Sequence, residues 1–167
     1  EDPKSPISES YRSLRTTLMY SSKENDTNSG KVILISSSGP GEGKTTTLVN
    51  LGIAYANMGK KTIILDTDLR KPVIHKIFSN DSKDRENGIS KYLTNQIEDY
   101  KKIINKTEVE NLSVIFSGLV PPNPSEILGS NKMNDFMEQL KGDYDIILLD
   151  SPPILAVTDP LVLMKNV

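Results

Sequence analysis

Three glycines, a lysine and three threonines stand close together in one short stretch of the chain, residues 36–47. Glycines let backbone N–H groups approach phosphate oxygens without a Cβ in the way, and a helix that begins there adds partial positive charge. The lysine of such a loop reaches the β- and γ-phosphates, and the threonine hydroxyl binds Mg²⁺. The stretch therefore predicts a phosphate-binding loop for a nucleoside triphosphate. Its contact residues are Gly39, Pro40, Gly41, Glu42, Gly43, Lys44, Thr45 and Thr46.

The loop departs from the strict pattern at Ser38, where a glycine is usual five residues before Gly43. Serine with Gly39 beside it is a mild departure. The alternative is a glycine-rich turn that binds nothing. An apolar strand pattern at residues 32–35 leads into the loop, and a helical pattern at residues 48–58 leads out of it, so the flanks favour phosphate binding.

Three aspartates end apolar strand patterns elsewhere in the chain. Asp66 and Asp68 follow residues 61–65, and Asp150 follows residues 146–149. Because the first two are spaced i,i+2, their side chains share one side of an extended chain. We expect all three to meet Lys44 and Thr45 and to form a Mg·nucleotide site, in which the Thr45 hydroxyl binds Mg²⁺ and Asp150 orients it. One carboxylate is then spare and could accept the proton of an attacking hydroxyl.

The elements that must position these residues read as alternating strands and helices. A strand at 32–35, a helix to 58 and a strand from 61 form a βαβ unit with parallel strands. Further strands are expected at 112–116 and 146–150. The sequence predicts an α/β fold, a three-layer αβα sandwich with a mainly parallel central sheet. In such sheets ligands bind at the carboxyl ends of the strands, where the loop and the aspartates lie.

The helices expected around this sheet have recognisable patterns. Residues 6–21 carry an apolar stripe at helical spacing, made of Ile7, Tyr11, Leu14 and Leu18. Ser125 is expected to cap a short helix, Asn131 to cap a longer one that runs to about residue 141, and residues 157–167 to form a helix on the sheet. Residues 97–104 are ambiguous between helix and loop. The single histidine, His75, is expected to be an ordinary residue of a short helix at 73–78.

Composition narrows the class of protein. The chain has 167 residues, enough for one domain, and a net charge of −2 that gives no indication of a nucleic-acid partner. It has no cysteine, which fits a reducing compartment, and no apolar run near the roughly 20 residues of a membrane span. It begins with Glu1 and stops inside an apolar segment, so we expect a piece of a longer chain. Residues 1–5 read as a linker or arm.

Glu9, Arg12 and Arg15 lie three residues apart along the first expected helix. One interpretation is an intrahelical ladder on a solvated face, which the pattern alone favours. The other is a set of ion pairs between subunits.

At these motifs the chain resembles the bacterial tyrosine kinases that regulate capsule and exopolysaccharide synthesis, whose catalytic domain is P-loop NTPase-like. The resemblance covers residues 3–167. It rests on residues 40–46 (Walker A), 63–72 (a second motif, Walker A′), 146–153 (Walker B) and 121–126, and on Glu9, Arg12 and Arg15. The Asp-x-Asp-x-Arg element of Walker A′ is the specific one, since very many NTPases share a phosphate loop.

The resemblance implies a role for each residue. Lys44 would bind the phosphates of ATP and Thr45 the Mg²⁺, Asp66 would be the candidate base close to the metal, Asp68 would support it, and Asp150 would orient the water shell of the metal. Lys44, Asp66 and Asp68 are thus the expected catalytic residues. Glu9, Arg12 and Arg15 become expected interface residues of a ring-shaped homo-oligomer, an octamer in the family.

The resemblance also implies partners and a location. The substrate would be the tyrosine-rich tail of a neighbouring subunit. The cytoplasmic tail of a membrane-spanning adaptor, separate or fused upstream, would activate the kinase and hold it at the inner face of the cell membrane. The six tyrosines here are scattered, and family members continue past residue 167 with further strands and that tail. We therefore expect a single kinase catalytic domain over residues 1–167 without those parts.

Two other classes remain as alternatives. Partition or septum-positioning ATPases carry a signature lysine four residues before the Gly of Gly-Lys-Thr, and Gly39 stands at that position here. The other alternative is an ATP-binding oligomeric scaffold that transfers no phosphate, which a chain without an acceptor tail would fit.

Overall fold

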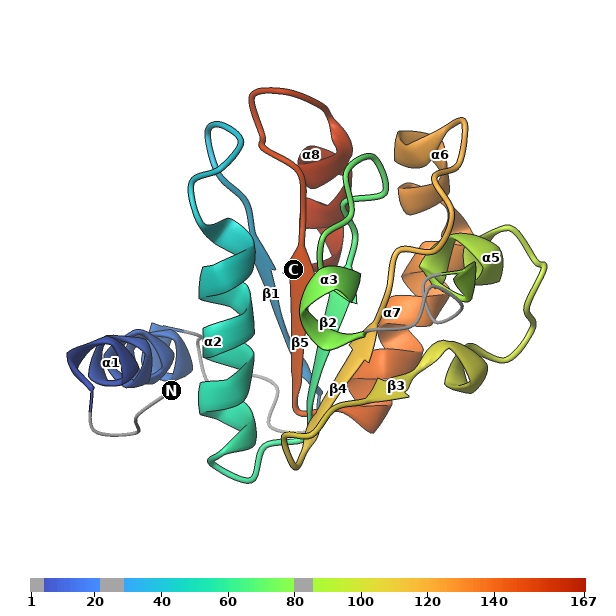
Figure 1. Cartoon of the computed structure of the whole chain (residues 1–167). Coiled ribbons are helices and arrows are strands. Elements are labelled where there is room, and N and C mark those ends of the chain that lie inside the picture. The colour runs from blue at the N-terminus through green and yellow to red at the C-terminus, as the bar shows by residue number, and fades with distance from the viewer. Residues whose placement is uncertain (1–4, 22–28, 80–85) are drawn as a thin grey trace.

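The computed structural model describes residues 5–21, 29–79 and 86–167, in which one sheet is covered by helices on both faces (Figure 1). The sheet has five strands in the order β1-β5-β2-β4-β3. Their bounds are Lys31–Ile35 for β1, Thr62–Asp66 for β2, Asn105–Lys106 for β3, Leu112–Ile115 for β4 and Ile146–Asp150 for β5. The predicted linker at residues 1–5 lies almost wholly outside the described residues.

The first four strands of that order run parallel, and only β3 pairs antiparallel with β4. The register places Ile35 and Asp66 on either side of Asp150. Because parallel strands end at the same edge of the sheet, the ends of β1, β5 and β2 bring the loops that follow them together. The predicted mainly parallel α/β fold is confirmed.

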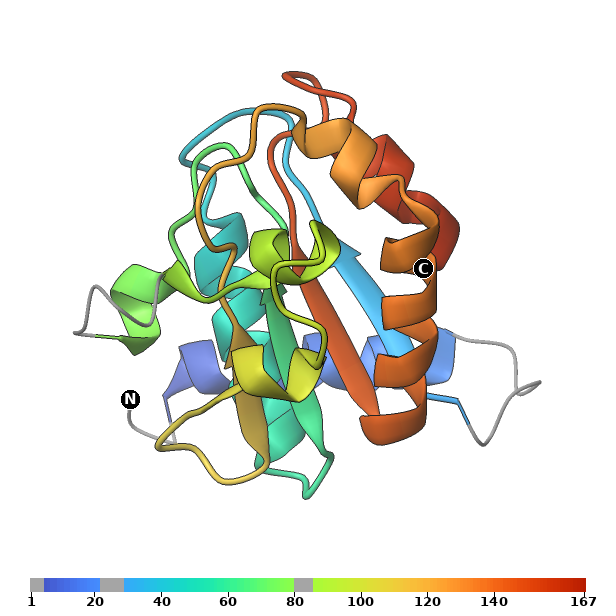
Figure 2. The ribbon, with the colours of Figure 1, turned by 90° about the vertical axis from the view of Figure 1, so that its right-hand side faces the viewer.

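Alternating strand residues face two separate hydrophobic clusters, which explains why both faces need helices. Ile63 and Leu65 belong to one cluster and Ile64 to the other. The first cluster is covered by α5 (Ile89–Leu93), α6 (Pro124–Leu128), α7 (Asn131–Asp143) and α8 (Asp159–Leu163). The second is covered by α2 (Lys44–Ala56), with α1 (Pro6–Ser21) and α3 (His75–Phe78) beside it. Figure 2 shows α7 on one side of the sheet and α2 on the other.

The helix predicted at residues 6–21 is confirmed, but its apolar stripe does not form a buried face. No residue of α1 is buried, and the side chains of Ile7 and Leu14 are exposed. Only Leu18 packs partly against the second cluster. The helix lies on the outer side of α2 and touches it along one edge (Figure 1), so the rest of the stripe stays at the surface.

Three local predictions are wrong in informative ways. Ser130, not Asn131, caps α7, with its hydroxyl accepting a hydrogen bond from the N–H of Met133. Ser125 does not cap α6, because its hydroxyl donates to Asp159 instead. The expected helix at 157–167 is a five-residue α8 followed by a 3₁₀ turn, Met164–Asn166. The ambiguous residues 97–104 contain a 3₁₀ helix, Tyr100–Ile103.

Candidate active site

The phosphate loop connects β1 to the first turn of α2 at the carboxyl edge of the sheet. Gly41 and Gly43 have φ angles of 78° and 81°, a left-handed conformation that residues with a Cβ rarely adopt. Gly43 is also the N-cap of α2, so Lys44 and Thr45 form the start of that helix. These two glycines are therefore required by the backbone of the loop.

Ser38 fits the loop because its backbone does not need glycine. Among the described residues only Asn95 and Asn111 combine a side chain with positive φ, so Ser38 has an ordinary φ. Its hydroxyl and N–H donate to the Glu42 carboxylate over 2.8 and 3.0 Å, and the N–H of Gly39 donates to it over 3.2 Å. These hydrogen bonds, that of the Ser38 hydroxyl first, lower the pKa of Glu42. Ser38 and Glu42 thus link the first part of the loop to its second part by hydrogen bonds.

Asp150 joins the loop to the sheet. The hydroxyl of Thr45 donates to Asp150 Oδ2 over 2.7 Å, which links the first turn of α2 to the end of β5. Burial raises the pKa of Asp150 to about 6, although the Thr45 hydrogen bond and the charge of Lys44 lower it. Lys44 is therefore close enough for its charge to stabilise this carboxylate.

Asp66 lies beside Asp150 on the neighbouring strand, and both side chains are fully buried. Asp66 Oδ2 accepts the N–H of Ile74 over 3.1 Å. Burial, followed by the charge of Asp150, raises the pKa of Asp66 to about 8. The second oxygen of each carboxylate, Oδ1, is buried without a hydrogen-bond partner. Buried, unpartnered carboxylate oxygens on two residues that are register partners of adjacent strands fit a hard cation such as Mg²⁺.

Asp68 is placed differently from the other two aspartates. β2 ends at Asp66, so the extended-chain spacing does not reach Asp68. Its Oδ1 accepts the N–H groups of Arg70 and Lys71 over 3.3 and 2.9 Å, which closes the turn after the strand. Among the described residues, no three acidic or histidine side chains converge as a metal cage. A Mg²⁺ ion here would need phosphate oxygens and water, with Thr45, in addition to Asp66 and Asp150.

Sequence reasoning assigned no role to three other residues at this edge. The Thr67 hydroxyl donates to the carbonyl of Asp150 over 2.7 Å, and the Thr67 N–H does so over 2.9 Å, so the strand ends of β2 and β5 are tied together. Arg70 forms an ion pair with the fully buried Asp159. The position of Thr67 between the two acids of the second motif could have indicated that its hydroxyl lies at this edge of the sheet. No pattern in the sequence joins Arg70 to a residue 89 positions later.

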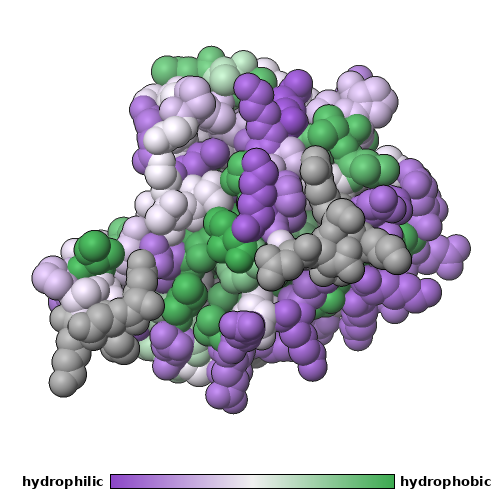
Figure 3. Space-filling model, viewed as in Figure 1, coloured by the Kyte–Doolittle hydropathy of each residue, from purple (hydrophilic) through white to green (hydrophobic). Residues whose placement is uncertain are grey.

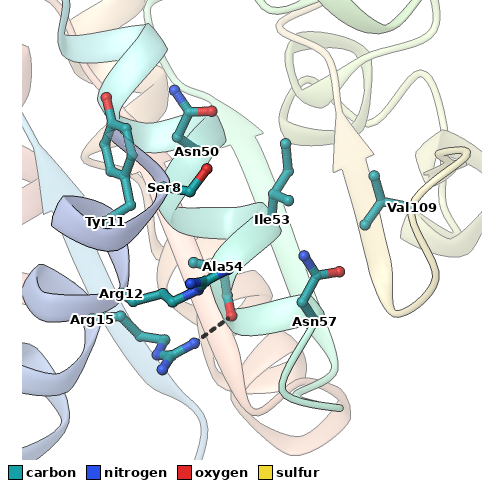
Figure 4. A pocket seen from close by; sticks show the side chains of 9 residues that line it. All are labelled: Ser8, Tyr11, Arg12, Arg15, Asn50, Ile53, Ala54, Asn57 and Val109. Carbon is teal, nitrogen blue, oxygen red and sulfur yellow. Dashed lines mark hydrogen bonds between the residues drawn. The ribbon is translucent and has the colours of Figure 1, made fainter. Parts of the chain in front are cut away.

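Glu9, Arg12 and Arg15 lie on α1, apart from the phosphate loop (Figure 1). Arg12 pairs with Glu9 over 2.9 Å on the surface, and Arg15 Nη1 donates to the carbonyl of Ala54 on α2 over 3.1 Å. Together with Ile53 and Val109, both arginines line a pocket of about 610 Å³ between α1 and α2 (Figure 4). Hydrophobic residues come to the surface along α2 on this face (Figure 3).

The AAA domain family matches residues 30–166 of the chain. The chain is 40% identical to CapB of Staphylococcus aureus over all 167 residues, which cover 70% of that protein. It is 36% identical to the tyrosine-protein kinase YwqD of Bacillus subtilis over 97% of this chain and 65% of that one. The chain thus spans about two-thirds of these relatives.

Solved structures agree with this relationship. The kinase domain of the Escherichia coli tyrosine kinase ETK has a TM-score of 0.91 at 32% identity, with 100% of this chain and 63% of that one covered. The chimerical protein CapA2B2 has a TM-score of 0.90 at 39% identity, with 99% and 70% covered. The septum site-determining protein MinD of Pyrococcus horikoshii, solved with Mg-ADP, has a TM-score of 0.68 at 26% identity, with 82% and 54% covered.

The ETK kinase domain and the CapA2B2 chimera thus match the chain over nearly its whole length with TM-scores of 0.91 and 0.90. The MinD structure shares the fold over less of the chain, with a TM-score of 0.68. A P-loop NTPase-like domain with a nucleotide site at the sheet edge accounts for all of these matches. The chain belongs to the bacterial tyrosine kinases of capsule and exopolysaccharide synthesis.

Proposed function

We propose that this domain transfers the γ-phosphoryl group of ATP to tyrosine. The observation that carries the proposal is the pair of buried carboxylates, Asp66 and Asp150, each with one unpartnered oxygen, of which Asp150 also accepts the Thr45 hydroxyl through its other oxygen. Asp150 and Thr45 hold Mg²⁺, which offsets the negative charge of the phosphates when it is bound. Lys44 binds the β- and γ-phosphates, and the N–H groups of the loop surround them.

Asp66 is the proposed proton acceptor. The tyrosine oxygen forms a bond to the γ-phosphorus while the bond from that phosphorus to the β,γ-bridging oxygen breaks. ADP carries the electron pair away, and the phenolic proton passes to the Asp66 carboxylate. Asp66 must be ionised to accept this proton, and a cation bound beside it favours the ionised form. Asp68 supports this step by closing the turn that carries Asp66.

The test is to incubate the chain with labelled ATP, Mg²⁺ and a tyrosine-rich peptide and to identify the labelled residue. A separate peptide is added because the six tyrosines of the chain are scattered and four of them, Tyr55, Tyr92, Tyr100 and Tyr144, are buried. We expect phosphotyrosine on the peptide. Release of free phosphate without phosphotyrosine would instead assign a switch ATPase.

Asp66→Asn is the matched variant for this assay. The amide keeps the shape of the side chain but cannot take up the phenolic proton. We expect transfer to fall by roughly 100-fold or more while nucleotide binding is unchanged or tighter. Retained transfer would remove Asp66 as the base.

The biological setting is proposed from the family. The kinase acts on the tyrosine-rich tail of a neighbouring subunit within a ring-shaped homo-oligomer, with Glu9, Arg12 and Arg15 in the subunit interface. A membrane-spanning adaptor holds it at the inner face of the cell membrane, where it regulates capsule or exopolysaccharide synthesis and export. The exposed Arg12–Glu9 pair and the pocket beside Arg15 leave this face of α1 accessible to a second subunit.

A further inference from the structure

One arginine connects three segments at the catalytic edge of the sheet. The guanidinium of Arg70, in the turn after β2, donates from Nε and Nη2 to the two carboxylate oxygens of Asp159 over 2.8 and 3.1 Å. Asp159 is the first residue of α8 and is fully buried. Ser125, in the first turn of α6, donates its hydroxyl to the same carboxylate and accepts from Arg70 Nη2 over 3.3 Å.

The carboxylate of Asp159 depends on this arrangement. A buried carboxylate is costly unless it is paired and hydrogen-bonded. Burial alone would raise the pKa of Asp159, but the hydrogen bonds from Arg70 and Ser125 lower it below its usual value. The planar fork of arginine fits the two oxygens at once, which a lysine ammonium cannot do.

The turn that carries Arg70 also carries the candidate catalytic aspartates. At one end Thr67 is bonded to the carbonyl of Asp150, and at the other the N–H groups of Arg70 and Lys71 bind Asp68. The loop that follows Asp150 leads directly to Asp159. The ion pair therefore links the turn after β2 to the end of the loop after β5. These two segments directly follow the strands that end in Asp66 and Asp150.

We propose that Arg70 and Asp159 form a clasp that positions Asp66 relative to Asp150 for Mg²⁺ binding and phosphoryl transfer. Both are positioning residues, since they act through the aspartates of the site. The effect of the clasp on transfer rests on the proposed function, whereas its effect on the cation does not. Residues that orient metal ligands typically change metal affinity or activity by about 10- to 100-fold when they are substituted.

The clasp is tested with Arg70→Lys and Asp159→Asn, and with Ser125→Ala as a milder variant. ADP binding is measured by calorimetry in EDTA, and then Mg²⁺ is titrated into the ADP-saturated protein. We expect ADP affinity in EDTA to stay within about twofold, because the phosphate loop is untouched, and Mg²⁺ affinity to fall by about tenfold. With the tyrosine peptide, kcat should fall by a similar factor while the KM for peptide is unchanged.

Glu138→Gln is the control, because it breaks an exposed ion pair with Lys141 on α7, away from the site. It should leave Mg²⁺ affinity and kcat at the wild-type values. If the Arg70 and Asp159 variants lower only the melting temperature and bind Mg²⁺ as the wild type does, the pair is merely structural and the proposal is wrong. If the wild type transfers no phosphate, the kinase proposal fails. The Mg²⁺ titration still shows whether the clasp positions the aspartates for the cation. If Asp159→Asn does not fold, the Mg²⁺ titrations of Arg70→Lys and Ser125→Ala test the proposal instead.

Discussion

Asp66 and Asp150 explain at the level of single residues why this site should take a cation. Both carboxyl groups are fully buried on adjacent strands, and each has one oxygen without a hydrogen-bond partner. Two neighbouring negative charges in such a place repel each other and lose their hydration. A proton or a metal ion relieves both costs, so the two compete for the same oxygens.

This competition predicts that Mg²⁺ releases a proton. With a pKa of about 8, Asp66 is mostly protonated at pH 7 when no cation is bound, because the pH lies below that pKa. Adding Mg²⁺ to ADP-saturated protein at pH 7 should therefore release about one proton, measured by calorimetry in buffers of different ionisation enthalpy. The released fraction should decrease toward zero as the pH rises through 8 and beyond.

Asp66→Asn is the control for proton release, because its amide has no proton to lose in this range. The variant should release far less than the wild type at pH 7. Equal release from both proteins would show that the proton comes from another group and that Asp66 is ionised before the cation arrives.

Lys44 should contribute much of the affinity for ATP. The charge of Lys44 reaches the site, where it lowers the pKa of Asp150. Lys44→Met keeps the length of the side chain but removes its charge-assisted hydrogen bonds to phosphate, worth about 1.5–3 kcal/mol each. ATP affinity measured by calorimetry should fall by about 100-fold or more. Lys60→Met, in the connection between α2 and β2 at the other end of α2 from the loop, should bind ATP normally. Wild-type affinity in Lys44→Met would remove the residue from the site.

Among the secondary-structure elements, α7 begins with a different capping residue from the one that the sequence predicts. Asn131 and Ser130 are both good capping residues, and sequence alone does not choose between them. In the structure Ser130 has an extended backbone and accepts the N–H of Met133 over 3.2 Å, whereas Asn131 is already helical. Ser130→Ala should lower the free energy of unfolding by about 1 kcal/mol, and Asn131→Ala should change it much less. Urea unfolding of the two variants decides this, and the reverse order of costs would place the cap at Asn131.

The elements that could be predicted are those with a strong local signal. β1, β2, β4 and β5 are apolar runs next to turn residues, and α2 follows from the glycines and lysine of the loop. β3 has only two residues and exists because it pairs with β4, so no local pattern reveals it. The place of Asp68 in a turn was not expected either, because no local pattern shows that β2 ends at Asp66 and not at Asp68. The contacts of Arg70 with Asp159 depend on the tertiary fold alone.

At the scale of the whole molecule, the catalytic edge and α1 occupy different parts of the domain (Figure 1). Among the described residues no helix is long and apolar enough to cross a bilayer. α1 packs on α2 without burying any of its own residues, which is a weak attachment for a helix of 16 residues. Its charged triplet and the pocket beside it give the domain a second surface that the nucleotide site does not use.

If this surface forms the subunit interface, Arg12→Glu should prevent oligomer formation. Arg12 is the better test than Arg15, because Arg15 also binds the carbonyl of Ala54 within its own chain. The substitution places two glutamates three residues apart on α1 and reverses a charge that we propose faces the neighbouring subunit. Light scattering should show a multiple of the 18.5 kDa chain mass for the wild type and a smaller species for the variant. Lys102→Glu, on the exposed surface of the 3₁₀ helix near β3, makes the same charge change and should leave the mass unchanged. An identical mass for wild type and Arg12→Glu, with the same melting temperature, would return the triplet to a solvated ladder within one helix.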